Sequence, residues 1–171
     1  MEKYILLQTI GIQGLHTLLH LLDKAKEYSV TSGKGEVALL SARLAPDMFD
    51  FTKQIQISTD DIRRNLYLLA GKDHVKYEDN ETTLDALKDR VEKTLLVVSA
   101  LTSADFSEAD NRHISLYFMG GKYVLGKDFI QEFAFMNYLF HVVTAYNILR
   151  AAGVSVGKTD FITKFSMHDA V

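Results

Sequence analysis

The histidines are the residues of this sequence best suited to chemistry, because an imidazole titrates near neutral pH and binds metal ions. His16 and His20 stand four residues apart in the segment HTLLH, the spacing of two metal ligands on one helix face. His141 stands in the segment NYLFHVVTAY. The chain contains no Cys, which excludes thiol catalysis, thiolate metal ligands and disulfides.

Helical periodicity places His16 and His20 on a polar face. At about 100° per residue, the opposite arc of the same helix carries only apolar side chains, namely Leu15, Leu18, Leu21, Leu22 and Ala25. We therefore expect both imidazoles to face solvent. They could bind a metal ion together with His141 only if this polar face turned inward.

His141 is expected to face the interior, because its own arc is mostly apolar and includes Ile130, Ala134, Tyr138, Ala145 and Ile148. A buried imidazole needs hydrogen-bond partners, and Asn137 and Thr144 on the same arc could supply them. In that interpretation His141 is a structural residue. In the alternative interpretation it is a ligand or an acid–base group.

A polar stripe also follows the segment 46–70. Gln56, Asp60 and Arg63 recur at helical spacing beside an apolar seam. The stripe is either an edge ion pair of little energetic worth or the wall of an interior pocket. In the second interpretation the predicted pocket residues are His141, Gln56, Asp60, Tyr146, Arg43 and Asn137.

Helices must position these side chains, and the sequence predicts four long ones. Helical patterns cover about residues 3–28, 46–70, 83–101 and 127–152, and a shorter one covers about 36–42. Pro46 is expected in the first turn of its helix, and Thr82 is expected to cap the third long helix. Alternating residues on both sides of the turn MGGK predict a β-hairpin within Arg112–Leu125.

The expected fold is therefore all-α. Residues 1–171 form one domain, an up-and-down four-helix bundle with a short extra helix and a small β-hairpin before the last helix. The last helix is apolar nearly all round. A helix of that kind needs cover on more than one side, so we expect a homodimer, or packing of the hairpin and tail over it.

Composition narrows the partners. The formal net charge is −3, and no Lys/Arg cluster interleaves with aromatic residues, so we expect no nucleic-acid partner. The apolar N-terminal segment carries Gln8, Gln13 and two His and lacks a cleavage site, so it predicts an amphipathic helix and no export signal or membrane span. The absence of Cys fits a cytoplasmic protein.

Three segments together resemble an uncharacterised bacterial family, a domain of unknown function grouped with the DinB-like superfamily. They are ALLSARLAPDMFDFTKQIQISTDDIRR (38–64), ETTLDALKDRVEKTL (81–95) and NYLFHVVTAYNILRAAGVSVGKTDF (137–161). The resemblance implies a four-helix bundle that is often dimeric. It also implies that many members bind a divalent ion through three His, and that some are thiol-dependent transferases or isomerases.

This chain departs from the metal pattern that the resemblance implies, one His on the second long helix and an HxxxH pair on the fourth. His141 is followed four residues later by Ala145, and residues 46–70 contain no His, so that Gln56 and Asp60 are the nearest substitutes. We expect no cofactor; a divalent metal (Zn, Ni or Mn), if bound, would use His141 with His16 and His20.

Two functions follow from this comparison. The first is a bundle with an interior polar pocket for a small-molecule ligand around His141. The alternative is a divalent-metal-dependent enzyme of the superfamily type.

Overall fold

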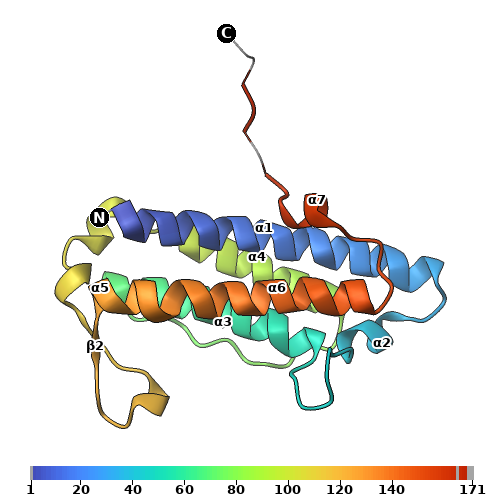
Figure 1. Ribbon diagram of the computed structural model, residues 1–171, viewed down its shortest axis with the longest axis horizontal. Helices are drawn as coiled ribbons and strands as arrows, with labels where there is room; N and C mark the ends of the chain where they lie inside the picture. The colour runs from blue at the N-terminus through green and yellow to red at the C-terminus, as the bar shows by residue number, and fades with distance from the viewer. Residues whose placement is uncertain (1, 165, 169–171) are drawn as a thin grey trace.

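The computed structural model describes residues 2–164 and 166–168, and its four long helices lie side by side (Figure 1). They are α1 (Glu2–Thr31), α3 (Phe51–Ala70), α4 (Leu84–Ser99) and α6 (Phe135–Ala151). A short α5 (Gly126–Phe129) and a π-helical turn (Ile130–Ala134) lead directly into α6. The predicted four-helix bundle is confirmed.

Short elements fill the connections. They are α2 (Glu36–Leu40), the 3-10 turns η1 (Ser103–Phe106), η2 (Ala109–Asn111) and η3 (Tyr117–Met119), and α7 (Lys158–Phe161). Strands β1 (His113–Ile114) and β2 (Val124–Leu125) pair antiparallel, with His113 opposite Leu125. The predicted hairpin is therefore confirmed, and it projects from one end of the bundle with η3 at its tip (Figure 1).

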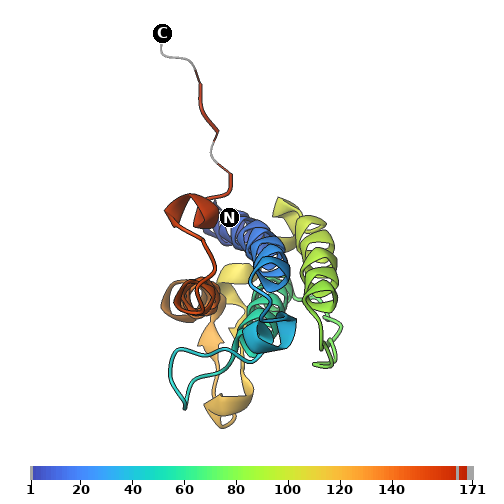
Figure 2. The ribbon, with the colours of Figure 1, turned by 90° about the vertical axis from the view of Figure 1, so that its right-hand side faces the viewer.

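The helix directions differ from the expected up-and-down order. Viewed end-on, α4 lies on one side of α1 and α6 on the other (Figure 2). Tyr67 bonds the carbonyl of Val97, near the end of both α3 and α4, so these two helices run in the same direction. Parallel neighbours cannot be joined by a tight turn. Residues 72–83, here called the strap, must therefore return along the length of α3.

Two predicted helix starts were wrong. Pro46 lies in a turn, and α3 begins after Asp50, whose side chain accepts a hydrogen bond from the Lys53 N–H at 2.9 Å. A carboxylate at this position satisfies a free amide and suits the positive end of the helix dipole. Similarly, Thr83 rather than Thr82 caps α4, accepting from the Ala86 N–H at 3.1 Å.

The predicted core faces of α1 and α6 are buried, including every apolar residue named for the two arcs. Two glycines let α1 approach its neighbours: a Cβ on Gly14 would lie 2.4 Å from the Tyr138 hydroxyl, which donates to the Gly11 carbonyl at 2.7 Å. Among the described residues, Lys3–Thr31 is the one helix long and apolar enough to span a membrane by length and composition. Five of its leucines, Leu7, Leu15, Leu18, Leu21 and Leu22, are buried inside the bundle, and Leu6 is exposed.

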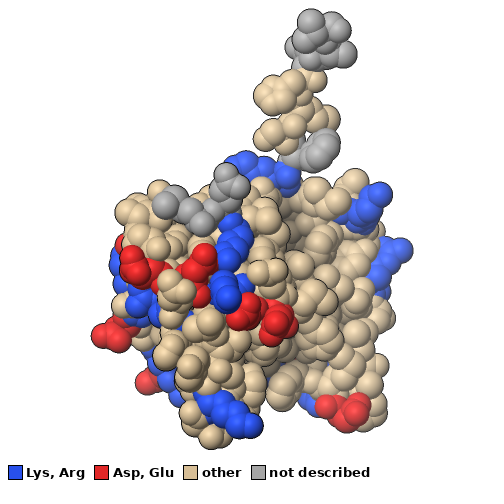
Figure 3. Space-filling view, turned by 60° about the vertical axis from the view of Figure 1, so that its left-hand side comes forward, with Lys and Arg blue, Asp and Glu red and all other residues tan. Residues whose placement is uncertain are grey.

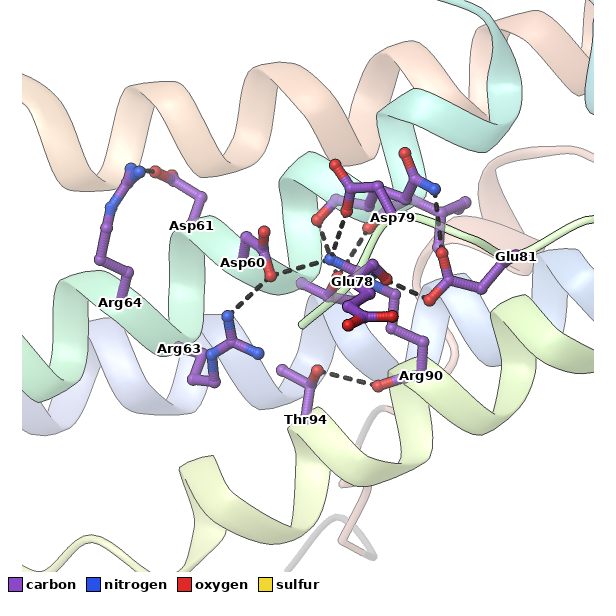
Figure 4. A network of polar contacts seen from close by, with 12 residues as sticks. Asp60, Asp61, Arg63, Arg64, Glu78, Asp79, Glu81, Arg90 and Thr94 are labelled. Atoms are coloured by element: carbon purple, nitrogen blue, oxygen red, sulfur yellow. Dashed lines mark hydrogen bonds and ion pairs between the residues drawn. The ribbon is translucent and has the colours of Figure 1, made fainter. Parts of the chain in front are cut away.

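Side chains of α3 and α4 hold the strap in place. Arg90 of α4 is 3% exposed, and its guanidinium contacts four groups at 2.8–3.0 Å: Asp60 on α3, and Asp79, Glu81 and the Glu78 carbonyl on the strap (Figure 4). Its Nε donates to the Thr59 hydroxyl. Although burial opposes the effect, these contacts raise the pKa of Arg90. One buried cation thus joins two helices and the strap.

We expect Arg90→Ala to lower the free energy of unfolding by roughly 3–5 kcal/mol, because it leaves carboxylates near Arg90 without their cation. Urea unfolding followed by circular dichroism measures the change. Lys26→Ala, which breaks an exposed pair with Asp85, is the control and should change stability little. Equal effects of the two variants would show that the Arg90 network contributes no more than a surface ion pair.

Candidate functional site

A cavity of about 390 Å³ lies between α3, α6, the strap and the hairpin tip. Its wall combines polar and charged residues with an aromatic side. The polar and charged residues are Lys53, Gln56, Asp60, Asp61, Arg64, Asp79, Asn137 and His141, and the apolar ones are Phe49, Ile57, Tyr117, Phe118 and Phe133. This size and this mixture of surfaces are typical of small-molecule sites.

His141 projects from α6 into this cavity and is 8% exposed. Its Nδ1 lies 2.7 Å from the Gln54 Oε1, while the Gln54 amide nitrogen donates to the Phe49 carbonyl. Since an amide oxygen only accepts, Nδ1 must carry the proton. Burial lowers the pKa of His141, which favours the neutral ring. The neutral ring therefore presents an unprotonated Nε2, for which the described residues offer no hydrogen-bond partner.

Asp61 of α3 borders the same cavity and is 1% exposed. One of its oxygens accepts from Arg64 at 2.6 Å, and the other has no hydrogen-bond partner among the described residues. Burial raises the pKa of Asp61, with Asn137, Arg64 and Asn65 opposing the rise. One cavity is thus bordered by an acidic group whose pKa burial raises and a basic group whose pKa burial lowers.

Four of the predicted pocket residues do come together here: His141, Gln56, Asp60 and Asn137. Asp60 forms ion pairs and also lines the cavity, but its partners are buried, so it is not the weak edge pair of the first interpretation. Its carboxylate pairs with Arg63 at 2.7 Å and with Arg90 at 2.9 Å, and it also forms part of the cavity wall. Gln56 lies beside it and donates to Glu81 of the strap at 2.9 Å.

Two predicted pocket residues lie elsewhere, which corrects the prediction. Tyr146 packs edge-on against Phe161 of α7, because its position on α6 turns it toward the C-terminal segment. Arg43 precedes α3 and pairs with Asp50 at the exposed start of that helix. The hydrogen-bond partners expected for His141 were also wrong. The Thr144 hydroxyl donates to the Phe140 carbonyl, and the imidazole of His141 bonds to Gln54 instead.

Sequence reasoning missed several cavity residues. Ile57, Asp61 and Arg64 directly follow Gln56, Asp60 and Arg63 along α3, so the stripe, which the sequence predicted to include Lys53, is one residue wider than predicted. Their periodicity was the available signal. Asp79 carried no comparable signal, because it belongs to the strap, whose course depends on the tertiary structure.

The residues do not fit a metal site of the implied kind. Within the described part of the chain, no three His, Cys, Asp or Glu side chains lie close enough to share a metal ion. His20 is paired instead with Asp160 of α7, 2.8 Å away. His16 and His20 are both half-buried, whereas the sequence predicted that they face solvent. The set of His141 with His16 and His20 is therefore not assembled.

Comparison with known proteins agrees with this architecture. A crystal structure of a DinB family member protein from Shewanella denitrificans superimposes with a TM-score of 0.93 and 34% sequence identity, covering 98% of this chain and 95% of that chain. No curated protein matches the sequence significantly. Residues 4–162 match the family described as Domain of unknown function (DUF1993). The chain therefore belongs to the DUF1993 family and has the fold of a DinB family member.

Proposed function

We propose that this protein binds a small molecule in the cavity beside His141, and that the ligand donates a hydrogen bond to Nε2. The observation that carries the proposal is the fixed orientation of the ring: Gln54 accepts from Nδ1, which directs the lone pair of Nε2 away from that bond. A largely buried nitrogen that can only accept favours a hydroxyl, thiol or amine group on the ligand, because leaving it unpaired costs free energy.

The aromatic side of the cavity supports a ligand with an apolar body. Phe118 contacts Phe133, with ring centroids 5.7 Å apart, and Tyr117 lies beside Phe118. These residues come from the hairpin tip and the π-helical turn, so both elements would touch the ligand. The charged residues of the wall already pair with one another, Lys53 with Asp79 and Arg64 with Asp61, which favours a ligand without a strong net charge.

A second candidate function is a divalent-metal-dependent enzyme, and the same Nε2 supports it, because a neutral imidazole nitrogen is a metal ligand as well as a hydrogen-bond acceptor. The ion would be Zn, Ni or Mn, and the reaction a thiol-dependent transfer or isomerisation. This function requires ligands beyond His141 that the described residues do not bring together.

We further propose a cytoplasmic homodimer, with neither nucleic acid nor membrane as a partner. The outward face of α6 supports a dimer, since Met136, Phe140 and Val143 are all exposed. The hairpin tip adds Tyr117, which is 92% exposed. On the face shown in Figure 3, charged side chains gather at the left and reach the middle, and a broad uncharged area lies to the right of them. Exposed apolar patches of this kind are typical of interfaces between chains.

The ring orientation and the ligand can be tested together by ¹⁵N NMR of the imidazole. We expect His141 to be neutral and protonated at Nδ1 at neutral pH, and small hydroxyl, thiol or amine fragments to shift Nε2 selectively. Tyr146→Phe, outside the cavity, should keep fragment binding, and His141→Leu should abolish it. Fragments that bind both variants equally, or a ring protonated at Nε2, would contradict the proposal.

Adding zinc, nickel or manganese in the same experiment separates the two functions. Stoichiometric binding of one ion at Nε2, measured by elemental analysis and lost in His141→Leu, would favour the metal-dependent enzyme.

For the dimer, light scattering of the wild-type protein at micromolar concentration should give twice the mass of the chain. Phe140→Glu should shift the protein to a monomer, because it places a charge in the centre of the apolar face of α6. Glu132→Lys, at an exposed polar position nearby in the chain, is the control and should remain dimeric. A wild-type monomer under these conditions would refute the dimer.

A further inference from the structure

The strap, residues 72–83, is attached to the bundle mainly by side chains rather than by backbone hydrogen bonds. It contains neither helix nor strand, and residues 73–82 make no backbone–backbone hydrogen bond within the described part of the chain. Its contacts with the bundle are instead made by side chains: Tyr77 lies over the Arg63 guanidinium, 3.7 Å from the ring centroid, while Asp79 pairs with Lys53 and Arg90. A segment held this way can detach without breaking a helix or a sheet.

His74 is the residue of the strap whose protonation would affect how firmly the strap is attached to the bundle. Its Nδ1 is buried and has no hydrogen-bond partner among the described residues. The charged side chains that act on it all come from α3: Arg63 and Arg64 disfavour its cationic form, and Asp60 favours it more weakly. Asp60 is already paired with Arg63 and Arg90, so it offers a protonated His74 little compensation.

The strap also forms part of the cavity wall. Asp79 borders the cavity beside His141 and, on its other side, a second hollow between α2 and α3 that Glu81 also lines. Detachment of the strap would remove this wall and free Gln56 from Glu81. The position of the strap therefore determines how enclosed the cavity is.

We propose that the strap is a pH-sensitive lid, docked most firmly on α3 and α4 when His74 is neutral and detaching more often when the buried, unpartnered imidazole is protonated. The side of the cavity that Asp79 forms then opens more often in mild acid than at neutral pH. This inference concerns the chain itself and holds whether or not the cavity binds the ligand proposed above.

The direction of the pH effect follows from the pKa values. Burial, with Arg63 and Arg64, lowers the pKa of the docked His74, so the docked strap binds fewer protons than the released one. Docking is therefore strongest above the ordinary imidazole pKa of 6.5 and weakens as the pH falls below it. The pKa values of Asp79 and Glu81 are lowered from 3.8 and 4.5, because Lys53 and Arg90 outweigh the effect of burial. Both acids stay ionised in this range, which leaves His74 as the strap group that titrates.

Two-dimensional NMR of the aromatic rings in the whole chain tests the lid. Tyr77 lies against the Arg63 guanidinium only while the strap is docked, so its ring shifts should move toward those of a solvent-exposed tyrosine between about pH 7.5 and about pH 5.5, while those of the buried Tyr138 change little. His74→Gln, which cannot be protonated, should abolish this difference. His113→Gln is the matched control, because His113 is exposed on the hairpin and stacks on Tyr123. It should behave as the wild type does.

A proton NMR titration of His74 covers the case in which His74→Gln fails to dock at any pH. A pKa for His74 below the ordinary imidazole value of 6.5 supports the lid. A pKa at or above 6.5, or Tyr77 ring shifts that are the same at both pH values in the wild type, overturns it. These readouts need no ligand, so failure of the lid and failure of the proposed ligand site are separate outcomes.

Discussion

The structure depends on one buried cation that must be neutralised where three segments of the chain meet. Taking a guanidinium out of water costs several kcal/mol, and only closely placed carboxylates and carbonyls offset the cost. Arg90 finds them on α3 and on the strap, so its contacts join α3, α4 and the docked strap. The hydrophobic core accounts for the packing of the helices, whereas this charge network determines the course of the segment that has no secondary structure.

The parallel direction of α3 and α4 is the reason a cavity exists. A chain that returned by a tight turn would leave the polar stripe of α3 exposed to solvent. The strap instead crosses the open side of α3 and brings Asp79 and Glu81 to it, while the hairpin brings Phe118 to the other side. The bundle supplies the imidazole of His141 and most of the polar wall, and the irregular connections add Phe49, Asp79, Tyr117 and Phe118. The helices hold His141 in a fixed position, whereas the connections belong to the part of a fold that is generally more mobile and more variable.

Local patterns predicted the parts of this protein that obey helical periodicity. The leucine arc of α1 and the inward position of His141 followed from spacing alone, and both are found in the structure. The bond between His141 and Gln54 joins residues 87 positions apart, so no local pattern could reveal it. The direction of α4 was not predicted, for a related reason. The polar segment after Gly71 is long enough to run back along α3, but its course depends on its contacts with Arg90. The start of α3 lies later than predicted for a local reason. The carboxylate of Asp50 caps the helix, and Pro46 lies in the turn before it.

The π-helical turn at Ile130–Ala134 has a consequence for how sequences of this family can vary in length. A π turn accommodates one more residue than an α turn, so one residue more or fewer at this place can be accommodated without unfolding the helix. The segments on its two sides can keep separate registers: α5 stays aligned with the hairpin, and α6 keeps Tyr138 and His141 directed at α1 and α3. Relatives that lack the extra residue should therefore retain the imidazole in place and differ in how the hairpin is oriented over the bundle.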